Sequence, residues 1–332
     1  MAGFFLGLDI GATKSQALVA NEEGQALGYG LAGPGNHEVV GYDGLVQAME
    51  TCTNQAIRMA GVSNDQILGA GFGVAGFDWP GELSPTLNAI AQLGLKAPVE
   101  AVNDTIIGLV AGAEQGWGVG LVSGTGCNCW GWDERYKIGR VTGMGGDFGE
   151  FAGGGDIVHR AIIAIAYETF KRGPVTRLTP ALIQMAGAEN SLDLFEGLTL
   201  EKYQLDARAA PTVFQIAAEG DPVAVGILEW AGKELGEMAN GVIRQIGLEE
   251  KAFDLVLIGS IFKGSFRVIE VLRESVHAVA SRARLVHLQA PPVVGGVLIG
   301  MRLAGRQPSF VRGRLLESAR DLFRDTPTSE NL

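Results

Sequence analysis

The chain has 332 residues, which is long for one hydrophobic core and suits two units of roughly 150 residues each. Its formal net charge of −11 argues against a nucleic-acid partner, but not against one nucleotide held by backbone N–H groups. Three cysteines in so long a chain favour the reducing cytoplasm, and we expect neither a signal peptide nor a membrane span.

The first part of the chain predicts a small sheet with helices. Three strands joined by tight turns are expected at residues 3–10, 15–20 and 25–32. Apolar residues recur at helical spacing from 42 to 60, and Gly61 then ends the predicted helix. Further strands are expected at 67–76 and 97–104, with a helix between them.

The same order of elements begins again near residue 118. Gly7 to Gly11 aligns with Gly120 to Gly124 at a constant offset of 113 residues, and each run leads into a glycine turn. We therefore predict a duplicated α/β fold with a cleft between its halves. The predicted units are 1–112 and 113–305. A helical insertion lies near 157–250, and a helix near 306–325 can pack back on the first unit.

The two glycine turns are the strongest candidates for phosphate binding. In the first, Gly11 leaves room for a polyphosphate against the backbone, while Thr13 and Lys14 can donate hydrogen bonds to its oxygens. The second turn surrounds Thr125 with Gly124 and Gly126. Each turn alone is a weak signal, but two at equivalent places predict a triphosphate gripped from both sides.

Two acids at strand ends have predicted roles in phosphoryl transfer. Asp104 follows a short strand, where its carboxylate can accept the proton of an attacking hydroxyl. It can also cap the helix that follows. Asp9 suits Mg²⁺, through water, because this ion prefers hard oxygen ligands.

Other loops offer weaker candidates for ligand contacts. A purine or ribose can lie on the backbone at Gly259 and Ser260, because ligands gather at the carboxyl ends of strands in α/β sheets. Asp147 lies among glycines and can hold sugar hydroxyls, and the loop residues Asn36 and His37 can bond the same ligand.

The ordered motifs DIGATKS, PGNHEVVG, GVAG, AVNDT, SGTGCN, GGDFGE and LIGS resemble those of the N-acetylglucosamine kinases. They also resemble the wider family of ATPases that activate benzoyl- and hydroxyacyl-CoA reductases. The resemblance covers about residues 4–305 and implies a ribonuclease H-like fold in each unit, with ATP and Mg²⁺ in the cleft. It implies phosphate contacts at Gly11, Thr13, Lys14 and 124–126. It also implies sugar contacts at Asn36, Asp104, Thr125 and Asp147, with Asp104 as the base.

One motif departs from the sugar-kinase pattern and leaves the acceptor open. Those kinases usually carry G-D-E-G-S where this chain has Gly146 to Glu150. We expect phosphoryl transfer to an amino sugar such as N-acetylglucosamine or glucosamine. The alternative is an ATPase that drives a conformational change in a partner enzyme. A sugar-responsive repressor is disfavoured by the acidic charge, and a homodimer is an assembly that the sequence leaves open.

Overall fold

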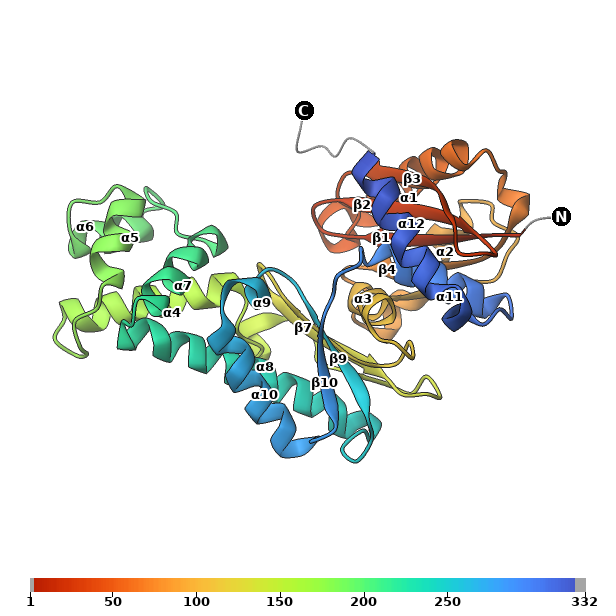
Figure 1. The fold of residues 1–332 in the computed structure, drawn as a ribbon. Coiled ribbons are helices and arrows are strands. Elements are labelled where there is room, and N and C mark those ends of the chain that lie inside the picture. Colours follow the sequence, from red (N-terminus) through yellow and green to blue (C-terminus); the bar gives the residue numbers. More distant parts are fainter. Residues whose placement is uncertain (1–2, 326–332) are drawn as a thin grey trace.

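The computed structural model describes residues 3–325, which form two α/β lobes (Figure 1). The first sheet has the order β3-β2-β1-β4-β5. Its strands are β1 (Phe4–Ile10), β2 (Ser15–Asn21), β3 (Ala26–Ala32), β4 (Ile67–Val74) and β5 (Val99–Asn103). β1 and β2 pair antiparallel, as do β2 and β3, whereas β4 runs parallel to both β1 and β5.

The second sheet repeats this topology. Its order is β10-β9-β6-β7-β8, so that β6 takes the central place of β1 and β7 and β8 the places of β2 and β3. Its strands are β6 (Gly118–Ser123), β7 (Cys127–Trp132), β8 (Ile138–Arg140), β9 (Phe253–Ile258) and β10 (Ala283–His287). The predicted α/β fold class is therefore confirmed.

The helices of the first lobe and of the insertion come first in the chain. They are α1 (His37–Ala60), α2 (Leu83–Ala91), α3 (Asp104–Gly112), α4 (Gly154–Thr169), α5 (Leu178–Ala186), α6 (Ser191–Thr199) and α7 (Ala210–Ala218). The remaining helices are α8 (Pro222–Ile246), α9 (Ile261–Gly264), α10 (Phe266–Val279), α11 (Val293–Leu303) and α12 (Arg312–Asp325). α8 and α10 pack on each other beside the second sheet, and α4 to α7 extend away from it (Figure 1).

α1 begins five residues earlier than the apolar pattern predicts. Its first turn is capped by Asn36, whose side-chain oxygen accepts a hydrogen bond from the backbone N–H of Glu38 at 2.9 Å. Gly41, with a φ of 69°, then interrupts the helix. This kink separates the capped turn from the long amphipathic part, and only the latter carries a helical pattern of apolar residues.

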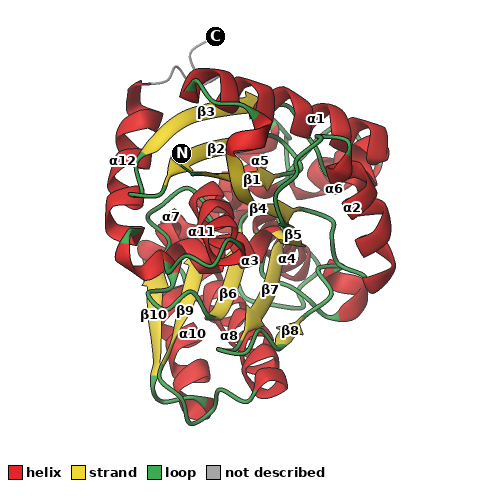
Figure 2. Ribbon diagram, turned by 90° about the vertical axis from the view of Figure 1, so that its right-hand side faces the viewer, coloured by secondary structure: helices red, strands yellow, loops and turns green. Residues whose placement is uncertain are grey.

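α3 and α11 lie between the two sheets (Figure 2). α3 packs against β6 and β9, α11 packs against β1 and β4, and the two helices pack on each other. A Cβ atom at Gly7 would lie 2.4 Å from backbone atoms of α11, so only glycine allows this approach. Residues 293–303 fall inside the range predicted for the second unit, yet they cover the sheet of the first.

α12 returns to the first lobe. The Ser318 hydroxyl lies 3.0 Å from the backbone nitrogen of Ala26, and the Phe323 ring meets Tyr29 edge to face at 4.4 Å. The lobes also meet near β8, where the Arg140 guanidinium lies about 5 Å from the rings of both Trp79 and Trp130. Among residues 3–325, no helix is long and apolar enough to cross a membrane.

Candidate functional site

The β1–β2 turn carries the first set of predicted residues at the carboxyl end of the first sheet. The Gly11 N–H donates to the Lys14 carbonyl at 3.0 Å, which closes the turn and leaves Thr13 and Lys14 exposed. Asp9 is half-buried near the end of β1. Burial raises the pKa of Asp9 to about 7, the charge of Asp104 adds to this, and Lys14 opposes it.

The β6–β7 turn occupies the equivalent place in the second lobe and is more firmly fixed. The Gly124 N–H donates to the Gly126 carbonyl at 2.8 Å, and the Gly154 N–H donates to the Gly124 carbonyl at 2.7 Å. An added Cβ at Gly124 or Gly126 would meet no heavy atom within 4 Å. The outer face of this turn is therefore open to a ligand.

A cavity of about 350 Å³, here called the acidic cavity, brings the two turns together. Ala12 of the first turn and Thr125 of the second both line it. Its remaining lining residues are Asn36, Glu38, Ala75, Gly76, Asp78, Asn103, Asp104, Thr105, Val122, Gly124, Gly126, Cys127, Asn128 and Gly143. Of the residues predicted from the sequence, Asn36, Asp104 and the turn 124–126 line this cavity together. Gly11, Thr13, Lys14, His37 and Asp147 are not among its lining residues.

Asp104 is the first residue of α3 and is held at the cavity by a helix cap. The Asn103 side chain accepts a hydrogen bond from the Thr105 N–H at 2.9 Å, so Asn103 caps the helix in place of the predicted Asp104. Burial raises the pKa of Asp104 to about 6, although backbone hydrogen bonds oppose the shift. A carboxyl with this pKa is mostly ionised at neutral pH and basic enough to accept a proton.

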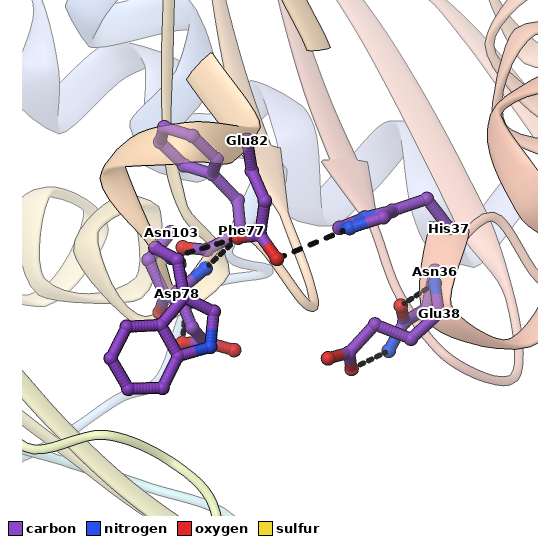
Figure 3. Close-up of polar contacts among 8 residues, drawn as sticks. Asn36, His37, Glu38, Phe77, Asp78, Glu82 and Asn103 are labelled. Carbon is purple, nitrogen blue, oxygen red and sulfur yellow. Dashed lines mark hydrogen bonds and ion pairs between the residues drawn. The ribbon is translucent and has the colours of Figure 1, made fainter. Parts of the chain in front are cut away.

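Asn36 lines the acidic cavity, whereas His37 is not among its lining residues. The His37 Nε2 atom lies 3.5 Å from Glu82 Oε1 (Figure 3). The His37 ring also stacks on Tyr42, with 4.6 Å between centroids. Only 8% of the His37 side chain is exposed. This geometry gives His37 a packing contact behind the site.

Asp147 lies outside the acidic cavity. It is exposed on the 3₁₀ turn Gly145–Phe148 and is absent from the lining residues. The segment is anchored instead by Glu150, a buried carboxylate that accepts hydrogen bonds from the backbone and hydroxyl of Thr142. Gly143 is the residue of this segment that reaches the cavity.

A second cavity, of about 660 Å³, lies on the other side of the β6–β7 turn. It is lined by Gly124, Thr125, Ala207, Arg208, Ala210, Pro211, Phe214, Gln215, Ala218, Ser260, Ile261, Lys263 and Gly264. Gly259 stands beside it with a φ of 116°, and a Cβ there would lie 2.1 Å from the Ser123 carbonyl oxygen. Gly124 and Thr125 line both cavities, so one turn forms the boundary between the two spaces.

The BadF/BadG/BcrA/BcrD ATPase family model matches residues 6–300, which is most of the chain. The chain belongs to this family. Its match spans both lobes and both glycine turns, so the predicted relationship to the reductase-activating ATPases and the N-acetylglucosamine kinases is confirmed.

Two characterised relatives align with nearly the whole of this family member. One, from Dictyostelium discoideum, is named N-acetyl-D-glucosamine kinase; it is 24% identical and covers 90% of this chain and 97% of its own. The other, from Clostridium acetobutylicum, is named N-acetylmuramic acid/N-acetylglucosamine kinase; it is 23% identical and covers 89% of this chain and 97% of its own.

Solved structures show that the fold is shared with sugar kinases. A Chromobacterium violaceum protein, provisionally named an N-acetylglucosamine kinase, has a TM-score of 0.66, 20% identity and coverage of 90% of this chain and 98% of its own. A Streptomyces griseus glucokinase solved with glucose and AMPPNP has a TM-score of 0.53, 18% identity and coverage of 96% and 100%.

The carboxylates of Asp9 and Asp104 are ligands of the kind that a Mg²⁺ ion uses. Among residues 3–325, no group of three or more His, Cys, Asp or Glu side chains is placed to hold a metal. Asp9 and Asp104 are close enough for the charge of Asp104 to raise the pKa of Asp9. Mg²⁺ keeps several waters and needs only one or two carboxylates beside substrate phosphates, and two half-buried acids suit that ion.

Several cavity residues were missed by the sequence analysis. They are Glu38, Asp78, Asn128 and Lys263. Glu38 and Asp78 each had a usable signal, because Glu38 follows the predicted Asn36-His37 loop and Asp78 follows the GVAG strand end. Asn128 and Lys263 had none, because only the fold shows that the β7 strand and the short α9 helix face the cavities.

Proposed function

We propose that this chain is an ATP-dependent kinase that transfers the γ-phosphoryl group to a hydroxyl of an amino sugar. The observation that carries the proposal is the boundary at Gly124 and Thr125, which line both cavities. A nucleotide in the second cavity can therefore present its terminal phosphate to an acceptor in the acidic cavity. The names of the two relatives support an amino sugar as the acceptor.

The residues of the chain divide the chemistry between them. Asp104 accepts the proton of the attacking hydroxyl while the oxygen forms its bond to phosphorus and ADP leaves. Thr13, Lys14 and the backbone around Thr125 bind phosphate oxygens, and Asn36 orients the acceptor. Asp9 would hold a Mg²⁺ ion through water, and such an ion would supply charge neutralisation at the phosphates. Gly259 and Ser260 support the nucleoside, and Asp147 could reach the sugar only if its segment moved.

Replacement of the base is the direct test. Asp104→Asn keeps the shape of the side chain but cannot accept a proton, so kcat should fall by about 100-fold or more, measured as sugar-dependent ADP release. ATP should still bind, as followed by calorimetry. Asp65→Asn is the matched control, since Asp65 is an exposed acid of the same lobe paired with Lys96. Sugar-kinase activity of Asp104→Asn close to that of the unaltered chain would refute the assignment.

An ATPase that drives a partner enzyme is the second candidate, favoured by the family to which the chain belongs. Such activators hold an iron–sulphur cluster with cysteines of both subunits. Here Cys129 is fully buried and the Cys127 thiol lies 3.2 Å from the Phe151 carbonyl oxygen. Burial raises the pKa of Cys127 to about 12 and also raises the pKa of Cys129, which disfavours the thiolates that such a cluster needs. ATP hydrolysis without any sugar, with iron–sulphur absorbance, would support this candidate over the kinase.

The cellular setting completes the proposal. Three free cysteines suit a reducing cytoplasm, and we propose that location for the enzyme. A homodimer is the assembly to test first, and light scattering of the purified protein would distinguish it from a monomer.

A further inference from the structure

We propose that Glu38 and Asp78 determine the acceptor, and that the acidic cavity selects an amino sugar whose amino group is free and positively charged. This inference rests on the proposed kinase function and concerns the same site. It ranks three sugars by charge: a cationic amino sugar first, a neutral N-acetylated one second, and one that also bears a carboxylate last.

The first observation is the charge of the acidic cavity. Three carboxylates line it, from Glu38, Asp78 and Asp104, and none of its lining residues is a lysine, arginine or histidine. Asp104 is accounted for by the reacting hydroxyl. The nearest basic group in the turns, Lys14, acts on Asp9 at the phosphate end. Two carboxylates therefore remain without a cation and without a role in phosphoryl transfer.

The second observation is that the fold holds Glu38 in place. It occupies the first turn of α1, where its backbone N–H donates to the capping Asn36 side chain. A Cβ at Gly76 would lie 2.3 Å from the Asn36 side-chain oxygen and 3.1 Å from the Glu38 Cγ atom. From there the Glu38 side chain points toward the segment that carries Asp78 (Figure 3).

The third observation is the burial of Asp78, which is only 8% exposed. Its Oδ1 atom accepts a hydrogen bond from the Asn103 side chain at 3.0 Å, and its N–H donates to Glu82 at 2.8 Å. Burial, followed by the charges of Asp104, Glu38 and Glu82, raises the pKa of Asp78 to about 7, although Asn128 opposes the shift. A cation beside it would remove this electrostatic cost.

These groups distinguish the three sugars by elementary electrostatics. An ammonium group offers three donors and a positive charge to the two carboxylates. An acetamido group offers one N–H donor and brings a carbonyl oxygen that the carboxylates cannot bond. The lactyl carboxylate of N-acetylmuramic acid adds a negative charge to a cavity that already holds three acids.

The test compares kcat/KM for glucosamine, N-acetylglucosamine and N-acetylmuramic acid by ADP release at neutral pH. The unaltered chain should prefer them in that order. Glu38→Gln and Asp78→Asn should each lower the ratio of kcat/KM for glucosamine to that for N-acetylglucosamine by about tenfold, the value of one lost charge-assisted hydrogen bond. Glu50→Gln, on the exposed side of α1, and Asp65→Asn are the matched controls and should leave the ratio unchanged.

The outcomes separate this inference from the kinase function. The proposed specificity would be refuted, but not the kinase function, if the unaltered chain preferred N-acetylglucosamine. The same holds if Glu38→Gln and Asp78→Asn lowered kcat/KM equally for glucosamine and N-acetylglucosamine. No ADP release with any amino sugar would refute both. Calorimetric binding of glucosamine to Asp104→Asn gives a second readout, and it should weaken about tenfold when Glu38→Gln is added.

Discussion

The two lobes share one topology but differ in what stands at the carboxyl ends of their strands. Three acids end or follow strands of the first sheet: Asp9, Asp78 and Asp104. The equivalent ends of the second sheet carry Val122, Gly259 and Leu288. A duplicated fold thus supplies two copies of a ligand-binding edge, of which one carries three acids and the other carries none at these three positions.

This difference in strand-end residues fits the two ligands of the proposed function, because the acceptor site uses acids and the nucleotide site does not. Under the proposed function, the acceptor needs a base and a Mg²⁺ ion would need oxygen ligands, and the acids of the first lobe would supply both. A nucleotide brings its own negative charge, and carboxylates at the second edge would repel it. The β6–β7 turn instead offers backbone at Gly124 and Gly126 with open space beside both.

The largest effect should come from filling that open space. In Gly124→Val the branched side chain would enter the boundary shared by both cavities, so kcat/KM should fall about 100-fold or more for ATP and sugar alike. The melting temperature should change little, because no heavy atom lies within 4 Å of the new Cβ. Kinetics and calorimetric melting on one sample measure both.

The same change in the first lobe should behave differently. A Cβ at Gly11 would lie 2.8 Å from the Lys14 carbonyl oxygen, so Gly11→Val must distort the turn. We expect it to lower the free energy of unfolding by about 1–3 kcal/mol as well as activity. Equal losses of stability in Gly124→Val and Gly11→Val would contradict the expected difference in free space between the two turns.

A smaller effect is expected from the charge of the first turn. Lys14 is exposed and its charge lowers the pKa of Asp9. Under the proposed function, its ammonium binds a terminal phosphate. Lys14→Met should lower kcat about tenfold, with less effect at high salt. Lys96→Met, a surface change in the same lobe, is the control.

Lys263→Met should raise KM for ATP more than it lowers kcat, since Lys263 lines only the second cavity.

The sequence predicted the architecture well because its signals are local. The hairpins and the helix that ends at Gly61 each have turn or capping residues within a few positions. The constant offset between Gly7 to Gly11 and Gly120 to Gly124 predicted the duplication. These features need no knowledge of how the lobes sit together.

What the sequence could not predict depends on contacts between distant segments. α11 follows the second sheet in the chain but packs on the first, through Gly7 and its neighbours. His37 and Asn36 are adjacent, yet the Asn36 cap turns one side chain into the cavity and the other toward Glu82. Asp78 follows a strand end in the sequence, but its burial and its hydrogen bond with Asn103 arise only in the folded chain.

The smallest effect concerns Asp9, the acid whose counterpart is Val122. Its pKa of about 7 in the folded chain lies above the ordinary value of 3.8, because burial disfavours the charged form. Such a group stabilises the folded state fully below its unfolded pKa, and this contribution is lost as pH rises through about 7. Asp9→Asn should therefore raise the free energy of unfolding at pH 8 by on the order of 1 kcal/mol, since solvent screening limits the gain.

Urea unfolding at several pH values measures this gain, which should shrink steadily as the pH falls from 8 to 5. Mg²⁺ with ATP should stabilise the unaltered chain more than Asp9→Asn at pH 8, because only the carboxylate can bind the hydrated ion. If Asp9→Asn raises the free energy of unfolding by the same amount at pH 8 and at pH 5, the charge of Asp9 is not the cause. Equal stabilisation of both proteins by Mg²⁺ with ATP would place the ion elsewhere, and the chemical difference between the lobes would then rest on Asp78 and Asp104 alone.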